Sequence, residues 1–140
     1  ISVTKIPNTP GVAFKLFDVL AKHKINVDII LQSIGRDSTK DITFTVSKRN
    51  AEETIECVKS VFDSEEKDII CDRSVAKISI VGAGMESHPG TASKMFEALY
   101  ERDINIDMIA TSEIKISVLI NLEDADRAVS AIHKAFFPAE

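Results

Sequence analysis

The sequence predicts an α+β protein made of two tandem copies of a βαββαβ unit, each an antiparallel sheet with helices on one face. Three observations support this fold class. The chain repeats itself at an offset of 79 residues, and both halves alternate strand-like and helix-like hydrophobic patterns in the same order. The composition, 44% hydrophobic and 28% charged over 140 residues, is that of a globular protein with room for two small cores. We therefore predict domains at residues 1–73 and 74–140.

The repeat is clearest between Pro10–Ser33 and Pro89–Ser112, where 11 of the 24 aligned positions are identical. A Pro-Gly pair opens both segments, and Ile-Asn-Val-Asp at 25–28 aligns with Ile-Asn-Ile-Asp at 104–107. Unrelated segments rarely agree to this extent, so the chain contains an internal duplication.

In the first copy, β-branched residues predict a strand at Ile1–Lys5, and an apolar stripe with helical spacing runs from the Pro-Gly pair to about Lys24. Pro10 suits the first helical turn, and Thr9 before it is the better N-cap. The later elements are a hairpin at 26–33 and 41–47, a helix at 52–62 and a final strand at 68–72.

The second copy predicts a strand at 77–81, a helix from Pro89 to about Asp103, a hairpin at 105–112 and 114–121, and a helix at 124–136. The sequence then stops at Glu140, so we expect the last strand of this unit to be missing or supplied by another segment. The first residue is Ile1 rather than Met, which favours a piece of a longer chain over a complete small subunit.

Composition excludes several classes of function. The net charge of −5 comes from interspersed acids and bases, so we expect no nucleic-acid partner. No apolar run approaches the length of a membrane span, so we expect no membrane association. Cys57 and Cys71 have the spacing of neither a disulfide framework nor a zinc site, which favours reduced thiols in the cytoplasm.

Motifs for catalysis are weak. Val-Gly-Ala-Gly at 81–84 follows a predicted strand, but Ser87 stands where a dinucleotide-binding fingerprint needs its third glycine. The histidines at 23, 88 and 133 lie in unrelated contexts, and no phosphate-binding loop occurs. We therefore predict no catalytic residue, no metal and no cofactor in this chain.

Binding of an α-amino acid fits the residues better. The Pro-Gly pair begins a helix whose first N–H groups are unpaired and attract a carboxylate, and Gly11 allows a close approach. Asp28 can accept from an ammonium group, and Asn26 and Gln32 offer amides. The same residues also have structural explanations, since Asn26 can cap a turn and Pro-Gly can simply start a helix.

At these residues the chain resembles the paired ACT domains at the C-terminal end of aspartate kinases, over essentially its whole length. The segments that carry the resemblance in the first copy are IPNTPGVA at 6–13, INVDIILQS at 25–33 and DITF at 41–44. In the second copy they are VGAGM at 81–85, SHPG at 87–90 and IATSEIKISVLI at 109–120.

The resemblance implies an allosteric region that mediates feedback inhibition of aspartate kinase by lysine, threonine or both. It also implies a homodimer formed through ACT domains, a catalytic domain or subunit as partner, and a cytoplasmic location. The parent enzyme would use ATP and Mg²⁺ to phosphorylate aspartate, whereas this chain alone would perform no phosphotransfer. Two alternatives remain: an ACT sensor of another amino-acid pathway enzyme, or a purely dimerising module.

Carried over by motif position, the effector contacts include one set from each copy. In the first copy they fall on Asn8, Gly11, Val12, Ala13, Asn26, Val27, Asp28, Gln32 and Ser33. In the second copy they fall on Asn105, Ile106 and Thr111, which would close the site from the facing side. Asn8 stands where family members often carry an acid, which leaves the identity of the effector open.

Overall fold

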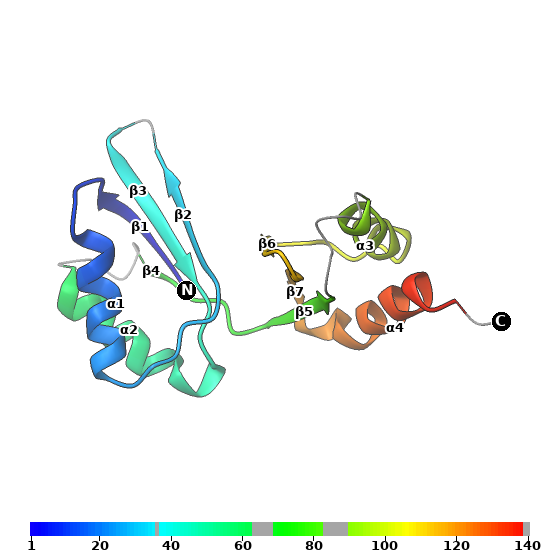
Figure 1. The fold of residues 1–140 in the computed structure, drawn as a ribbon. Helices are drawn as coiled ribbons and strands as arrows, with labels where there is room; N and C mark the ends of the chain where they lie inside the picture. The colour runs from blue at the N-terminus through cyan, green and yellow to red at the C-terminus, as the bar shows by residue number, and fades with distance from the viewer. Residues whose placement is uncertain (36, 63–68, 83–89, 139–140) are drawn as a thin grey trace. The chain divides into compact units, whose positions relative to one another are not determined.

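The computed structural model describes residues 1–35, 37–62, 69–82 and 90–138. The chain divides into two compact units, Ile1–Arg73 and Ser74–Glu140 (Figure 1). Each unit has an antiparallel sheet whose buried face packs against two helices. The predicted α+β fold class is therefore confirmed.

The first unit contains β1 (Ser2–Pro7), α1 (Val12–Lys22), β2 (Ile30–Ile34), β3 (Thr39–Phe44), a 3₁₀ turn (Lys48–Asn50), α2 (Ala51–Val61) and β4 (Ile69–Ile70). Its strands lie in the order β2-β3-β1-β4, so β2 forms one edge of the sheet. The core between sheet and helices includes Leu16, Leu20 and Phe44, and Phe17 packs edge-on against the Phe44 ring at 5.6 Å.

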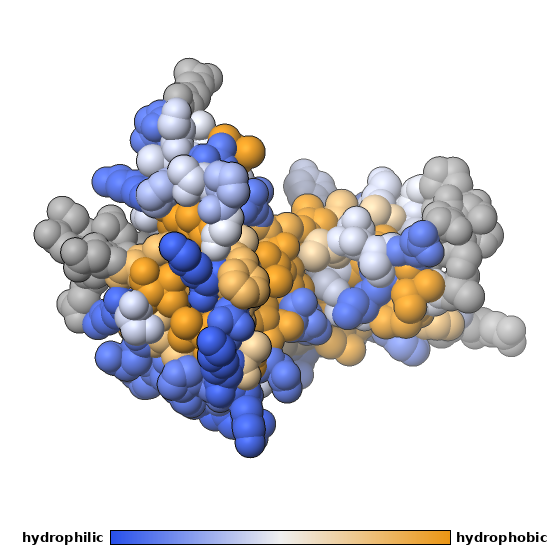
Figure 2. Space-filling view, turned by 60° about the vertical axis from the view of Figure 1, so that its left-hand side comes forward, coloured by the Kyte–Doolittle hydropathy of each residue, from blue (hydrophilic) through white to orange (hydrophobic). Residues whose placement is uncertain are grey.

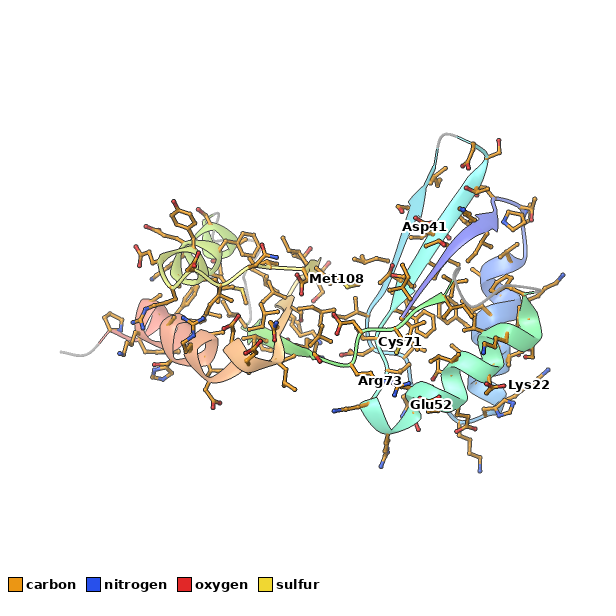
Figure 3. The ribbon with its side chains drawn as sticks, turned by 180° about the vertical axis from the view of Figure 1, so that it is seen from behind. Lys22, Asp41, Glu52, Cys71, Arg73 and Met108 are labelled. Atoms are coloured by element: carbon orange, nitrogen blue, oxygen red, sulfur yellow. The ribbon has the colours of Figure 1, made fainter. Side chains whose placement is uncertain are left out.

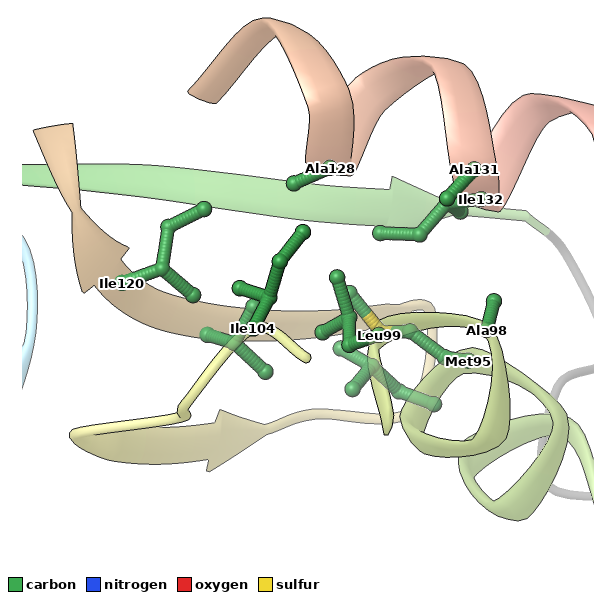
Figure 4. Packing of buried hydrophobic residues seen from close by; sticks show 10 residues of the cluster. Met95, Ala98, Leu99, Ile104, Ile120, Ala128, Ala131 and Ile132 are labelled. Carbon is green, nitrogen blue, oxygen red and sulfur yellow. The ribbon is translucent and has the colours of Figure 1, made fainter. Parts of the chain in front are cut away.

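The second unit contains β5 (Val75–Val81), α3 (Thr91–Glu101), β6 (Met108–Thr111), β7 (Lys115–Asn121), a 3₁₀ turn (Leu122–Asp124) and α4 (Ala125–Phe136). Its core is a separate cluster in which Met95 and Leu99 of α3 face Ile132 of α4 and the strands (Figure 4). The described residues form three strands in the order β5-β7-β6. None of them occupies the place beside β5 that β4 takes beside β1.

The start of each first helix differs from the sequence prediction. Gly11 and Gly90 occupy the N-cap positions of α1 and α3, with left-handed φ angles of 89° and 100°. The helix in the first unit therefore begins at Val12, after the Pro-Gly pair. The predicted N-cap role of Thr9 is wrong, because the left-handed glycine turns the chain into the helix and no side chain caps it.

The strand after each first helix starts later than the sequence indicates. We predicted strands from Asn26 and Asn105, whereas β2 and β6 begin at Ile30 and Met108. Lys24 and the equivalent Asp103 have left-handed φ angles of 58° and 56°, which end the helices and turn the chain. The residues that follow, including 26–28 and 105–107, therefore form connecting segments rather than strands.

A β-bulge interrupts β1. Its register with β3 shifts between Val3 and Ile6, and Lys5 within the bulge has a φ of 57°. The Lys5 N–H donates to the Asp41 carboxylate at 3.1 Å. Beyond the bulge the strand continues to Pro7, two residues past the predicted end, and brings the following loop to one end of the sheet.

Candidate functional site

The loop between β1 and α1 presents unpaired backbone groups to solvent. Asn8 is exposed, and its N–H donates to the Ser38 carbonyl at 3.1 Å, which fixes the loop beside the β2–β3 turn. The first bond within α1 runs from the Lys15 N–H to the Gly11 carbonyl at 3.0 Å. The N–H groups of Val12 and Ala13 therefore have no carbonyl acceptor within the helix. The positive end of the helix dipole can hold an anion there.

The second group of predicted residues lies between α1 and β2. Asn26 and Asp28 are exposed and Val27 is half-buried. The Asp28 N–H donates to the Thr45 carbonyl at 3.1 Å, which places this segment just beyond the last residue of β3. Asp28 is therefore an exposed acid in the segment that connects α1 to β2.

These two groups lie at opposite ends of the first unit. Asn8 is bonded to Ser38, before β3 begins, and Asp28 is bonded to Thr45, after β3 ends. An extended strand rises about 3.3 Å per residue, so the two groups are about 20 Å apart. That distance exceeds the length of one extended lysine molecule, so a single amino acid cannot contact both groups of the same unit.

Gln32 and Ser33 occupy the middle of the edge strand β2. Gln32 pairs with Ile42 and shares its helix-facing side, whereas Ser33 pairs with Asp41 on the opposite side. All five residues of β2 are exposed, including Ile30 and Ile34, with 49% and 66% of their surface accessible. Hydrophobic side chains reach the surface of this unit among hydrophilic ones (Figure 2).

The second unit repeats part of this arrangement. Asn105 and Ile106 lie between α3 and β6, and the Asn105 amide donates to the Asp107 carboxylate at 3.1 Å. Thr111 ends β6, where it pairs with Ile116 and is exposed. Residues 83–89 lie outside the described residues; they include Ala83 and Gly84 of the glycine-rich motif, Ser87 and His88.

The described residues give no other sign of a reactive centre. No group of three metal-binding side chains occurs within 1–35, 37–62, 69–82 and 90–138. His23 contacts the Glu53 carboxylate at 3.2 Å, and His133 stacks on Phe137 with ring centroids 5.1 Å apart. Burial raises the pKa of the Cys57 thiol, which keeps it in the unreactive protonated form.

Two features of the first unit were not predicted. Arg73 pairs with Glu52 of α2 and so ties the end of the unit back to that helix (Figure 3). Its hydrogen bonds to Cys71 and Glu52 raise the pKa of Arg73. Lys40 of β3 is buried, with 7% of its surface accessible. The alternation of Lys40, Ile42 and Phe44 along one face was the sequence signal for this burial.

A family model described as "ACT domain" matches residues 1–62 and 78–136. The chain belongs to the ACT domain family. It is 46% identical over 136 residues to an aspartokinase of Helicobacter pylori, covering 97% of this chain and 33% of that protein. The chain thus spans about a third of the length of the curated relatives it matches.

Solved structures agree with this assignment. The ligand-free regulatory subunit of aspartate kinase from Thermus thermophilus superposes with a TM-score of 0.85 at 41% identity, covering 96% of this chain and 89% of that one. Aspartate kinase from Synechocystis gives a TM-score of 0.87 at 38% identity, covering 96% of this chain and 24% of that one. This ACT chain therefore corresponds to the regulatory region of aspartate kinases.

Replacing Gly11 with alanine should destabilise the fold without steric conflict. A Cβ at this position would meet no atom within 4 Å, so the cost is the left-handed φ alone, about 1–2 kcal/mol. Gly11→Asn should cost less, because asparagine tolerates that conformation. Urea denaturation of both variants measures the difference, and equal losses would contradict a conformational role for Gly11.

Proposed function

We propose that this chain is the allosteric amino-acid-binding region of an aspartate kinase and mediates feedback inhibition by lysine, threonine or both. The supporting observation is that the first unit exposes two complementary groups, the α1 N-terminus for a carboxylate and Asp28 for an ammonium group. These are the two charges that every free α-amino acid carries. The effector class rests on the family, since backbone amides and one carboxylate do not select a side chain.

The separation of the two groups favours a site shared between ACT units. Because one amino acid cannot span them within a unit, the loop at Asn8–Ala13 of one unit needs a partner surface from another. A second chain supplies such a surface if the exposed edge β2 associates with another ACT unit in a homodimer. In this arrangement Asn105, Ile106 and Thr111 contribute from the second unit of a partner chain.

An interfacial site also explains regulation. A ligand shifts a protein between two states only by its difference in affinity for them, and typical coupling amounts to about 1–3 kcal/mol. Effector binding between ACT units stabilises the associated state, and that state in turn inhibits the catalytic domain or subunit. The whole protein would phosphorylate aspartate with ATP and Mg²⁺ in the cytoplasm.

A thermal-shift screen against the twenty amino acids tests this function. We expect lysine, threonine or both to raise the unfolding midpoint of the chain, because a ligand that binds only the folded state stabilises it. A response to a different amino acid would support an ACT sensor of another pathway enzyme. A flat response to all twenty would contradict effector binding and leave a dimerising module.

Asp28→Ala is expected to weaken effector binding by about 1–3 kcal/mol, the scale of a lost charged hydrogen bond. Isothermal titration calorimetry with lysine and threonine measures the change. The control is Asp126→Ala, since Asp126 is an exposed carboxylate of α4 in the second unit that lies outside the predicted effector contacts. Equal weakening in both variants would contradict the assignment of the effector to the first unit.

A further inference from the structure

Arg127 of α4 joins the start of that helix to the end of α3. Its Nη1 donates to the Arg102 carbonyl at 3.0 Å, and its Nη2 pairs with the Asp124 carboxylate at 2.6 Å. Arg102 is the C-cap residue of α3, and α3 has no basic residue in its own last turn. The planar guanidinium therefore brings a cation from the neighbouring helix to the negative end of the α3 dipole.

The chain leaves α3 through a left-handed turn directly after the carbonyl that Arg127 holds. Asp103 has a φ of 56°, a conformation that a residue with a Cβ keeps only where its surroundings impose it. The next N–H, that of Ile104, donates back to the Leu99 carbonyl of α3 at 3.0 Å, and Ile104 belongs to the core of the second unit. The direction in which the chain leaves the helix therefore depends on contacts at the end of α3, and the bond from Arg127 ties that end to α4.

The segment that follows this turn carries two of the predicted effector contacts, Asn105 and Ile106. Asn105 is exposed, and its amide donates to the Asp107 carboxylate at 3.1 Å. The Asp107 N–H donates to the Leu119 carbonyl of β7 at 2.8 Å. Asn105 and Ile106 therefore lie in a short span between two fixed points, the end of α3 and the start of β6, and displacement of either point moves both residues.

The first unit has a related contact at the same place. His23 is equivalent to Arg102 by the 79-residue offset and is the C-cap residue of α1, and its ring contacts the Glu53 carboxylate at 3.2 Å. Glu53 is the third residue of α2, as Arg127 is the third residue of α4. In the first unit the contact joins two side chains that are each 51% exposed, whereas in the second unit it reaches the backbone. The third position of the second helix thus holds the end of the first helix in both units, and more directly in the second.

We propose that Arg127 is a positioning residue of the effector site, because it holds the turn at 103–107 so that Asn105 and Ile106 are presented to the effector. This role rests on the proposed function. A role in overall stability alone explains the contact less well, since 52% of the Arg127 side chain is accessible and exposed ion pairs contribute little to stability. The consequence is local: if the turn adopts the presented conformation for only a fraction of the time, the observed affinity falls by that fraction.

Calorimetry with lysine and threonine on the 140-residue chain tests this role. We expect Arg127→Met, which keeps an aliphatic stem and removes both bonds, to weaken effector binding about tenfold, as a turn presented about a tenth of the time would do. Asp124→Asn removes the ion pair but leaves the bond to the Arg102 carbonyl, so it should bind nearly as tightly as the unmodified chain. Lys134→Met is the matched control, because it removes an exposed cation from the other end of α4. Unchanged affinity in Arg127→Met, or an equal loss in Asp124→Asn or Lys134→Met, would overturn the proposal.

Hydrogen exchange followed by mass spectrometry gives a readout that a general loss of stability does not produce. In Arg127→Met the amides of residues 102–107 should exchange faster, and saturating lysine or threonine should restore their protection. The equivalent turn of the first unit, residues 23–28, should exchange as in the unmodified chain. Faster exchange throughout the second unit, or no change at 102–107, would contradict a positioning role.

The two measurements also separate this role from the effector function. If the unmodified chain binds lysine or threonine and Arg127→Met binds it equally well, the function stands and the positioning role fails. If the unmodified chain binds neither amino acid, the function fails, and exchange alone decides whether Arg127 holds the turn: faster exchange confined to 102–107 supports it, and unchanged exchange overturns it. Arg127→Lys replaces Arg127→Met if the latter does not fold. Its expected loss of affinity is smaller, because a lysine ammonium lacks the planar fork that bonds to both acceptors at once.

Discussion

Leu20→Ala and Leu99→Ala are each expected to lower the free energy of unfolding of their own unit by about 3–5 kcal/mol. The two leucines are equivalent in the repeat, and each has at most 1% of its surface accessible. Leucine-to-alanine changes at such sites lose the transfer free energy of the side chain and leave a cavity in a packed core. The two buried clusters share no residue, so each loss should fall on one unit.

Urea denaturation combined with hydrogen exchange and mass spectrometry measures both the size and the location of the loss. Leu122→Ala is the control, because this leucine is exposed and its truncation should cost less than about 0.5 kcal/mol. Faster exchange throughout both units after a single substitution would show that the two cores unfold as one, which contradicts the division into separate units.

The repeat made the fold largely predictable from sequence. Positions that are equivalent by the 79-residue offset have equivalent roles: Gly11 and Gly90 precede helices with the same left-handed φ, and Leu20 and Leu99 fill the two cores. Hydrophobic periodicity is sufficient for such elements, because burial of one face determines where helices and strands form. Strand starts were predicted less well, since Lys24 and Asp103 turn the chain in the left-handed conformation, which is rare for lysine and only moderately favoured by aspartate.

The candidate site was only partly predictable. Motif positions named the residues, but they carried no information on distance, and the structure separates Asn8 from Asp28 by the length of β3. The alternation along β3 could have indicated the burial of Lys40, but a lysine at such a position does not by itself suggest a buried residue. The ion pair between Arg73 and Glu52 joins separate parts of the chain, and no sequence pattern near either residue indicates that they pair.

The edge strand β2 is the surface through which we expect the proposed homodimer to form. Gly35 N–H donates to Thr39, and Thr45 N–H donates to Ile29, so the odd-numbered residues of β2 bond to β3. The N–H groups of Ile30, Gln32 and Ile34 therefore point outward, away from β3. An edge with free backbone groups and exposed isoleucines, and without proline or charge, is well suited to pair with another strand.

Ile30→Lys combined with Ile34→Lys is therefore expected to weaken homodimer formation by about 4 kcal/mol or more, roughly a thousand-fold. Each dimer would lose four buried isoleucine side chains, and in a symmetric pairing the new charges would repel one another. Because both residues are exposed in the unit, the double variant should fold normally. Sedimentation velocity measures association, and calorimetry with lysine and threonine measures the effector response.

The comparison with a control identifies the interface. Leu122→Lys combined with Val129→Lys adds the same charge at two exposed apolar residues of the second unit, so it accounts for the effect of charge alone. If only the β2 variant loses both association and effector binding, the edge completes the effector site, as the separation of Asn8 from Asp28 requires. If the β2 variant dimerises and binds effector normally, another surface joins the ACT units, and the site has to be built on that surface instead.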